Sequence, residues 1–162
     1  MKIFITGVAG FLGSHLADLM ISQGHTVAGN DNMIGGYADN VPQNVEFSQV
    51  DCCDLENLTK AMEGCDVVYH TAATAYEGLS VFSPVLVTRN IFEASVTTIT
   101  AAIRNKVKRI VYCSSMARYG HHDDVPYKET YECRPQDPYG IAKKAGEDVL
   151  KNLCETHGVE YV

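Results

Sequence analysis

Residues 3–13 read IFITGVAGFLG, a short apolar run followed at once by three glycines at intervals of three residues. The run Ile3–Thr6 is typical of a short buried strand, and the residues from Phe11 onward have helical spacing. A glycine-rich turn between a first strand and a first helix is typical of a dinucleotide-binding site. This stretch therefore decides how the rest of the chain is interpreted.

Each glycine of the Gly7, Gly10, Gly13 pattern has its own physical role in such a turn. The first permits the tight turn, the second lets the backbone approach a pyrophosphate, and the third lets helix and strand pack closely. The helix N-terminus adds backbone N–H donors and about half a positive charge. Ordinary turns also use glycine, so it is the placement after an N-terminal strand that indicates a phosphate site.

Asp31 ends the predicted second strand, 18 residues after Gly13. A carboxylate there accepts hydrogen bonds from a ribose diol and repels a 2′-phosphate, whereas its alternative role is that of a turn aspartate. No Lys or Arg occurs between Lys2 and Lys60. Nothing on this stretch can pair with a 2′-phosphate, so the sequence favours NAD over NADP.

Two further acidic residues follow the predicted third strand, in the stretch VDCCDL of residues 50–55. We expect Asp51 to hydrogen-bond an adenine amino group. We expect Asp54 to cap the next helix, since Asp is a favoured N-cap residue.

Strand and helix patterns alternate along the whole chain. The predicted strands are Ile3–Thr6, Thr26–Asn30, Val45–Val50, Asp66–His70, Arg109–Ser114 and Val159–Val162, and the predicted helices are Phe11–Gln23, Leu55–Met62, Pro84–Asn105 and Tyr139–His157. This alternation predicts an α/β fold of the Rossmann type, a doubly wound parallel sheet with helices on both faces. Ligands of such sheets bind at the carboxyl ends of the strands, at the topological switch point.

Tyr139 and Lys143 lie four residues apart at the start of the last predicted helix, so they share one helical face. A phenol with a pKa of about 10 is a poor base at neutral pH, but a nearby ammonium and a cationic nicotinamide both favour the phenolate. A tyrosine tuned in this way can take or give a proton while a hydride moves. The alternative is a solvated pair on an exposed face, because this spacing is common.

The predicted fifth strand ends at Ser114, and Ser115 follows directly after it. A hydroxyl at the carboxyl end of a strand can hold the substrate oxygen that gains or loses a proton. The alternative is a serine that caps a turn.

In this order and spacing, the motifs resemble the extended short-chain dehydrogenase/reductase family, in its NAD-dependent sugar epimerase/dehydratase branch. The resemblance runs over essentially the whole chain. It rests on the glycine turn, Asp31-Asn32, residues 51–54, His70-Thr71-Ala72-Ala73, Cys113-Ser114-Ser115 with Tyr119-Gly120, and the stretch Pro138–Lys143.

The resemblance implies a catalytic set and a cofactor site. Tyr139 would be the acid/base, Lys143 would bind the nicotinamide ribose and lower the pKa of Tyr139, and Ser115 would match the catalytic Ser or Thr. Residues 70–73 would lie along the pyrophosphate and nicotinamide. The residues predicted to bind NAD are Gly7, Gly10, Phe11, Leu12, Gly13, Asp31, Asn32, Asp51, Cys52, Ala72, Ala73, Tyr139 and Lys143.

The resemblance also implies a substrate and an assembly. The substrate would be a nucleotide sugar, with a UDP-sugar favoured, which tightly held NAD oxidises at C4. The assembly would be a homodimer formed through the predicted helices Pro84–Asn105 and Tyr139–His157.

Three features depart from the family pattern. Met116-Ala117 stand where 4,6-dehydratases carry an Asp-Glu pair, which favours epimerisation or reduction over dehydration. The N-x-x-G-T motif that the family carries on the predicted helix Pro84–Asn105 is incomplete. Asn90 is present, but Ile91 occupies the position of the motif's Asn, and Ala94-Ser95 replace Gly-Thr. Members usually carry a further C-terminal part that closes over the sugar nucleotide. We therefore expect residues 1–162 to be the NAD-binding domain and a substrate-binding C-terminal domain to be absent from this chain.

Three functions follow as alternatives. The first is an NAD-dependent nucleotide-sugar epimerase, and the second is a nucleotide-sugar reductase, dehydrogenase or dehydratase. The third is a non-catalytic dinucleotide-binding module. The presence of Ser115, Tyr139 and Lys143 argues against the third, because a pure binding module has no need of the tyrosine.

Composition excludes several other classes. The formal net charge of −7 repels phosphate backbones, so no nucleic-acid partner is expected. No apolar run approaches the roughly 18 residues of a membrane span, and the N-terminus lacks the pattern of a signal peptide, which predicts a cytoplasmic protein without a membrane partner.

The cysteine and histidine residues do not indicate a metal site. The six cysteines form no C-x-x-C pair and are predicted to be reduced thiols, mostly small core residues. Residues 121–124, HHDD, are predicted to form a solvated loop, because adjacent residues rarely bind one ion together. No metal is predicted.

Overall fold

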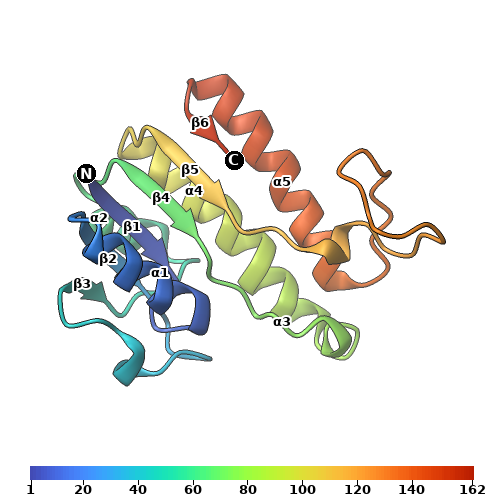
Figure 1. The fold of residues 1–162 in the computed structure, drawn as a ribbon, viewed down its shortest axis with the longest axis horizontal. Helices are drawn as coiled ribbons and strands as arrows, with labels where there is room; N and C mark the ends of the chain where they lie inside the picture. Colours follow the sequence, from blue (N-terminus) through green and yellow to red (C-terminus); the bar gives the residue numbers. More distant parts are fainter.

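The computed structural model describes all 162 residues and contains one six-stranded sheet (Figure 1). All neighbouring strands are parallel, in the order β3-β2-β1-β4-β5-β6. The strands are β1 (Lys2–Thr6), β2 (Thr26–Asn30), β3 (Val45–Ser48), β4 (Val67–His70), β5 (Arg109–Tyr112) and β6 (Glu160–Tyr161). The chain runs outward from β1 to β3 and then returns to β4 on the other side of β1, which makes the carboxyl ends of β1 and β4 the switch point of the sheet.

Five α-helices connect the strands. They are α1 (Phe11–Ser22), α2 (Leu55–Ala61), α3 (Pro84–Thr88), α4 (Ala94–Arg104) and α5 (Pro138–His157). Short 3₁₀ turns lie at Ala38–Asn40, Glu77–Leu79 and Met116–Arg118. None of the helices combines the length and the apolar character that crossing a membrane requires.

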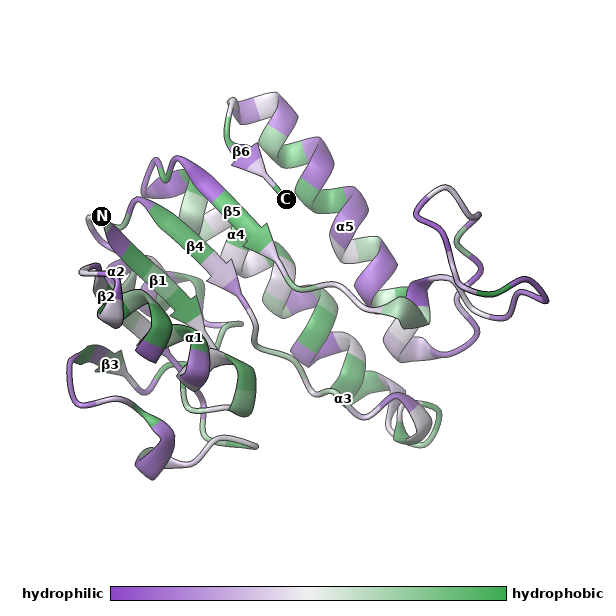
Figure 2. Ribbon diagram, in the orientation of Figure 1, coloured by the Kyte–Doolittle hydropathy of each residue, from purple (hydrophilic) through white to green (hydrophobic).

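Alternating side chains of β1 divide the core into two layers. Ile3 and Ile5 pack with Ala17 of α1 on one face of the sheet, whereas Phe4 packs with Leu58 and Ile99 on the other. Figure 2 shows the central strands as the most continuous hydrophobic segments, as expected for parallel strands that are covered on both sides. Burial of each large apolar side chain in these layers contributes about 1.5–3 kcal/mol to the free energy of unfolding. The predicted doubly wound α/β fold is confirmed.

Four predicted strands are longer than the observed ones. The predicted fourth and sixth strands, Asp66–His70 and Val159–Val162, are observed as Val67–His70 and Glu160–Tyr161, and the third and fifth end two residues early. The predicted fifth strand, Arg109–Ser114, ends at Tyr112, because the backbone turns there and the Ser114 N–H donates to the Tyr112 carbonyl at 3.1 Å. The predicted third strand, Val45–Val50, ends at Ser48 for a similar reason, since the Val50 N–H donates to the Ser48 carbonyl at 3.0 Å.

The predicted helix Pro84–Asn105 is continuous, but it is not α-helical throughout. Arg89–Glu93 form a π-helical turn between α3 and α4. A π turn has i→i+5 hydrogen bonds, and such turns occur often at functional sites. Residues on the two sides of this turn therefore do not follow the regular spacing of one α-helix.

Helix α5 has clear start and stop signals. The Asp137 side chain accepts a hydrogen bond from the Gly140 N–H at 2.9 Å, and Pro138 takes the first helical position. The helix ends at Gly158, which adopts the left-handed conformation with φ of 69°. These signals place the start of α5 one residue before the predicted start at Tyr139, and they set the orientation of Tyr139 and Lys143.

Candidate functional site

A cavity of about 460 Å³ lies at the carboxyl ends of the central strands. The segments that follow β1, β2, β4 and β5 all reach it, as does the first turn of α5. Every residue predicted to bind the cofactor lines this one cavity: Gly7, Gly10, Phe11, Leu12, Gly13, Asp31, Asn32, Asp51, Cys52, Ala72, Ala73, Tyr139 and Lys143. Their binding role itself stays a prediction.

The glycine turn is closely packed on its neighbours. Gly7 has φ of 70°, and a Cβ atom added there would lie 2.9 Å from the Ala72 Cα. A Cβ atom at Gly13 would overlap the carbonyl oxygen of Gly7. Larger residues are therefore excluded at both positions, and the backbone between β1 and α1 remains open toward the cavity.

Asp31 lies at this turn, largely buried. Its two carboxylate oxygens accept hydrogen bonds from the backbone N–H groups of Ala9, at 3.1 Å, and Met33, at 2.8 Å. The loop after Asp31 closes over it, since a Cβ atom on Gly36 would lie 2.9 Å from either oxygen. Among the residues that line the cavity, only Lys143 is basic. The neighbourhood of Asp31 is therefore suited to hydroxyl donors and not to a phosphate.

Asp51 also lines the cavity, within hydrogen-bond distance of Asn32, the residue after Asp31. Its carboxylate accepts hydrogen bonds from the Asn32 side chain at 3.3 Å, the Cys53 N–H at 2.8 Å and the Arg89 guanidinium at 3.2 Å. Partial burial acts to raise the pKa of Asp51, but these hydrogen bonds outweigh it, so the pKa lies below its ordinary value. Asp54 caps α2 as predicted, since its carboxylate accepts from the Asn57 N–H.

A buried chain of hydrogen bonds runs behind the cavity from β1 to the start of α4. The Thr6 hydroxyl accepts from the backbone N–H groups of residues 71 and 72, both at 3.1 Å. Both of its lone pairs are then occupied, so it donates its hydrogen to Nδ1 of His70, at 2.8 Å. His70 therefore carries its own hydrogen on Nε2 and donates it to Ser95 at 3.1 Å. The Ser95 hydroxyl donates in turn to the Ile91 carbonyl at 2.5 Å.

His70 is neutral in this arrangement. Burial, with a smaller contribution from the positive charge of Lys143, lowers the pKa of His70 to about 3. The side chain does not line the cavity, although the three residues after it, Thr71, Ala72 and Ala73, do. His70 thus orients the segment after β4 from behind.

Tyr139 and Lys143 meet the cavity from the first two turns of α5. Lys143 is almost fully buried, and its ammonium donates to the Cys113 carbonyl at 2.7 Å and lies 5.2 Å from the centre of the Tyr112 ring. Burial lowers the pKa of Lys143 to about 8, against the opposite effects of Cys113 and Glu147. Tyr139 packs against Ile91 and lines the same cavity as Lys143. The helix therefore presents a phenol and an ammonium to one space.

The two serines after β5 have different positions. Ser114 lines the cavity, and its hydroxyl donates to Glu147 of α5. Ser115 does not line it; its hydroxyl oxygen accepts from the Ala117 N–H at 3.2 Å and caps the 3₁₀ turn Met116–Arg118. The catalytic role of Ser115 stays a prediction.

Asn90 faces the cavity, although it is not among the residues predicted to bind the cofactor. It lines the cavity, and its amide donates to the Thr74 hydroxyl at 2.9 Å, whereas Ile91 is buried in the core beside Tyr139. Asn90 lies on the π turn. Matching motif positions by α-helical spacing fails there, because a π turn holds more residues than an α-helical turn. The glycine pair Gly35-Gly36 also lines the cavity, and this pair could have been recognised as a tight loop after Asp31.

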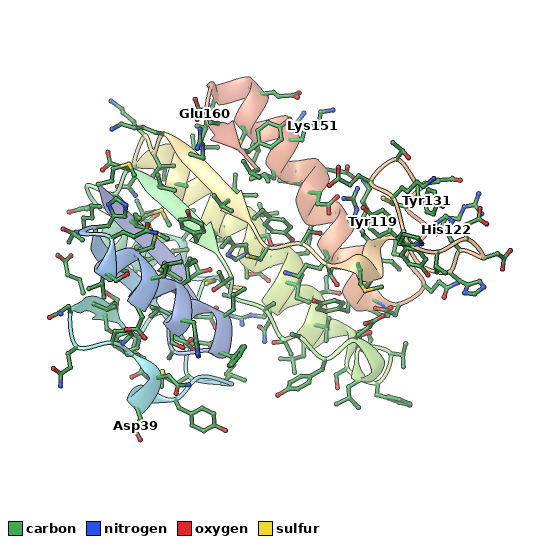
Figure 3. All side chains as sticks on the ribbon, in the orientation of Figure 1. Asp39, Tyr119, His122, Tyr131, Lys151 and Glu160 are labelled. Carbon is green, nitrogen blue, oxygen red and sulfur yellow. The ribbon has the colours of Figure 1, made fainter.

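Residues 119–136 form a loop that projects away from the sheet. Figure 3 shows the side chains of Tyr119, His122 and Tyr131 gathered in this loop, and the rings of His122 and Tyr131 are 5.0 Å apart. His121 lies 3.4 Å from Asp123, but no group of three metal-ligating side chains comes together in the structure.

Comparisons with known proteins agree with this architecture. The sequence model of the family described as NAD dependent epimerase/dehydratase matches residues 3–162. A probable UDP-arabinose 4-epimerase of Arabidopsis thaliana is 33% identical over 94% of this chain and 40% of its own length. The chain spans about half the length of the curated relatives it matches.

Two solved structures are similar over nearly the whole chain. The UDP-glucose 4-epimerase of Thermotoga maritima, solved with UDP-glucose, has a TM-score of 0.95 and 32% identity, covering 99% of this chain and 53% of that one. The UDP-glucose 4-epimerase of Brucella ovis, solved in complex with NAD, has a TM-score of 0.94 and 31% identity, covering 99% and 50%.

Proposed function

The chain belongs to the NAD-dependent epimerase/dehydratase family, and on this premise we propose that it provides the cofactor site and the acid–base residues of an NAD-dependent 4-epimerase acting on a UDP-hexose. One observation carries the proposal: Tyr139 and Lys143 line the same cavity as the glycine turn. The similarity to UDP-sugar 4-epimerases supports the choice of substrate class. The proposal that residues 1–162 form the NAD-binding domain is supported by the fact that all the predicted contacts lie in this one cavity.

The cavity fits NAD by its shape. Gly7 and Gly13 both line the cavity, their missing Cβ atoms let the turn pack directly on neighbouring backbone, and the turn leads into the N-terminus of α1, where a pyrophosphate is favoured. Asp31 would bind a ribose diol, Asp51 the adenine amino group, and Lys143 the nicotinamide ribose. When bound, NAD supplies the hydride acceptor of the oxidation and the hydride donor of the return step.

The chain's own residues handle the matching proton. Oxidation of a sugar alcohol removes a hydride from carbon and a proton from the hydroxyl, and the phenolic oxygen of Tyr139 accepts that proton and later returns it. The buried ammonium of Lys143 lines the same cavity as the Tyr139 phenol and places a positive charge there. The Cys113 carbonyl holds Lys143 in place. Ser115 is proposed to hold the sugar oxygen.

The residues after Ser115 favour epimerisation over dehydration. Met116 and Ala117 occupy the 3₁₀ turn there, and neither side chain can donate or accept a proton. An elimination of water would need an acid and a base at these positions, so reduction on the same scaffold is the nearer alternative.

The decisive experiment assays the complete protein that carries this chain with UDP-glucose and UDP-galactose. We expect their interconversion without net release of NADH. Tyr139→Phe should reduce turnover by about 10²–10⁴-fold while leaving NAD affinity unchanged. No interconversion of any UDP-hexose with NAD bound would contradict the proposal, and steady NADH release would indicate a dehydrogenase. A parent protein and a variant that both merely bind NAD would indicate a binding module.

We further propose that the protein is a homodimer. Phe82 and Val85, beside and within the start of α3, are each more than 80% exposed, which is unusual for large apolar side chains so close together. Light scattering of the purified protein should give twice the mass of one chain, and Val85→Lys should shift it toward the monomer. A monomeric parent protein would contradict this proposal.

A further inference from the structure

Glu147 lies one helical turn beyond Lys143 on α5 and is tied to the segment after β5 by both oxygens. One carboxylate oxygen accepts from the Ser114 hydroxyl, and the other pairs with the Arg118 guanidinium at 3.1 Å. The side chain of Glu147 is only 19% exposed, so this carboxylate is partly removed from water. Hydrogen-bond and charge partners of this kind offset the free-energy cost of removing a carboxylate from water.

The same segment holds the ammonium of Lys143. Ser114 directly follows Cys113, whose carbonyl oxygen accepts a hydrogen bond from the Lys143 ammonium at 2.7 Å. Glu147 therefore fixes the segment from one side while Lys143 bonds to it from the other. Since residues 139, 143 and 147 are spaced by four, Glu147 also shares the helical face of Tyr139 and Lys143.

Glu147 is the one carboxylic acid among the groups that shift the pKa of Lys143. The other groups that face Lys143 are His70 of β4, Tyr112 and Cys113 at the end of β5, and Tyr139 of α5. Burial keeps His70 neutral, with a pKa of about 3, and raises the pKa of Tyr112 to about 12 and that of Cys113 above its ordinary value. Around neutral pH His70 and Tyr112 carry no charge, and Cys113 and Glu147 are the two groups that oppose the effect of burial on the pKa of Lys143.

Arg118 weakens that negative charge. Its guanidinium pairs with Glu147, contacts the Cys133 sulfur at 3.2 Å and lies 5.0 Å from the centre of the Tyr119 ring. Arg118 thus connects the projecting loop to α5 and places a positive charge beyond Glu147. Removing Arg118 leaves the Glu147 charge less compensated, whereas removing the Glu147 charge removes one of the two effects that raise the pKa of Lys143.

We propose that Glu147 is a positioning residue for Lys143, which holds the Cys113–Ser114 segment against α5 and keeps Lys143 in its ammonium form, and that Arg118 limits this effect. The consequence for catalysis rests on the proposed function, because Lys143 matters to the reaction only if Tyr139 is the acid/base. The positioning itself concerns the chain without cofactor or substrate.

The test is a titration of Lys143 by nuclear magnetic resonance in the 162-residue chain without NAD, following its side-chain ¹³Cε and ¹⁵Nζ signals. Glu147→Gln keeps the size and an oxygen acceptor for Ser114 but removes the charge, and should lower the midpoint of Lys143 by about half a pH unit or more. Arg118→Met should raise the midpoint. Asp148→Asn is the matched control, because Asp148 lies next to Glu147 on α5 but forms an exposed pair with Lys144.

If Glu147 had a purely structural role, the Lys143 midpoint would shift in the same direction in Glu147→Gln and Arg118→Met, or in neither. Either result would overturn the proposal. A shift in Asp148→Asn as large as that in Glu147→Gln would also overturn it. If Glu147→Gln does not fold, Arg118→Met decides alone: a raised midpoint supports the proposal, and an unchanged or lowered one overturns it. The epimerase assay is independent of these outcomes, so failure of one proposal is distinguishable from failure of the other.

Discussion

The two ends of the cavity are built by different means. At the glycine end, backbone atoms come so close that Gly13 could not carry a Cβ atom without overlapping the Gly7 carbonyl. At the other end, the polar groups belong to buried or partly buried side chains: the Lys143 ammonium donates to the Cys113 carbonyl, and behind it Glu147 pairs with Arg118. The first end is determined by shape and the second by charge.

This difference indicates which changes each end tolerates. Added atoms should damage the glycine end even when they are apolar, because the obstacle is backbone that cannot move aside. Substitutions that preserve size should damage the charged end, because a buried group without its partner costs free energy even when the packing is unchanged. The predictions below test this division.

His70 should give the largest effect, through the dependence of stability on pH. The pKa of His70 is about 3 in the folded chain and 6.5 when exposed. The unfolded state therefore binds the proton first as the pH falls, and stability present above pH 6.5 is lost toward pH 3. The loss should be about 1.4 kcal/mol per pH unit, several kcal/mol in all.

The check is chemical denaturation of the parent chain and His70→Asn at intervals between about pH 7 and pH 4. The parent should lose stability more steeply than the variant, because only the parent has this group to protonate. Parallel curves would show that His70 does not remain neutral in the folded chain.

Gly13→Ala should disrupt the packing at the glycine end of the cavity. The new methyl group meets the Gly7 carbonyl, so we expect a loss of about 1–3 kcal/mol in the free energy of unfolding. Displacement of the turn should also weaken NAD binding by at least about tenfold. Thermal unfolding and calorimetric titration with NAD measure the two effects.

Gly78→Ala is the matched control, because nothing lies within 4 Å of a Cβ atom added at Gly78. Equal losses in the two variants would argue against close packing as the reason for glycine at position 13.

Asp31 is the exception, a charged side chain at the glycine end. Asp31→Asn removes the charge at nearly constant size, and should reduce the preference for NAD over NADP by about tenfold, or 1.4 kcal/mol. Calorimetric titration with both dinucleotides measures the ratio. Asp39→Asn is the control, since Figure 3 shows Asp39 at the edge of the molecule. An unchanged ratio in Asp31→Asn would mean that shape alone selects the cofactor.

Asp54→Ala should have the smallest effect. Loss of the side-chain cap of α2 should lower the free energy of unfolding by about 1 kcal/mol. Asp54 does not line the cavity, so NAD affinity should not change. A change in affinity larger than the change in stability would show that α2 is coupled to the cavity more directly than its cap suggests.

Features that depend on neighbouring residues could be predicted from the sequence. The strand before Gly7, the Asp54 cap and the shared face of Tyr139 and Lys143 all follow from spacing or local hydrogen bonds. The parallel sheet followed from the alternation of strands and helices, because few topologies satisfy that order.

Features that depend on contacts between distant residues could not be predicted. The pairs Arg118–Glu147 and Arg89–Asp51 join segments 29 and 38 positions apart, and no spacing rule connects them. The different positions of Ser114 and Ser115 follow from the turn after Tyr112, where the Ser114 hydroxyl donates to Glu147 and Ser115 caps the next 3₁₀ turn. The sequence pattern showed two hydroxyl groups, and only the structure showed which one faces the cavity.

The π turn at Arg89–Glu93 has a consequence for how this helix tolerates change in length. Within it, Asn90 lines the cavity, and two residues after it Ser95 completes the hydrogen-bond chain from Thr6. A π turn accommodates one extra residue between two α-helical segments, so deleting one residue within it would restore regular α-helix while α3 and α4 keep their phase. The loss would fall on the turn itself, and Asn90 would change its position relative to the cavity.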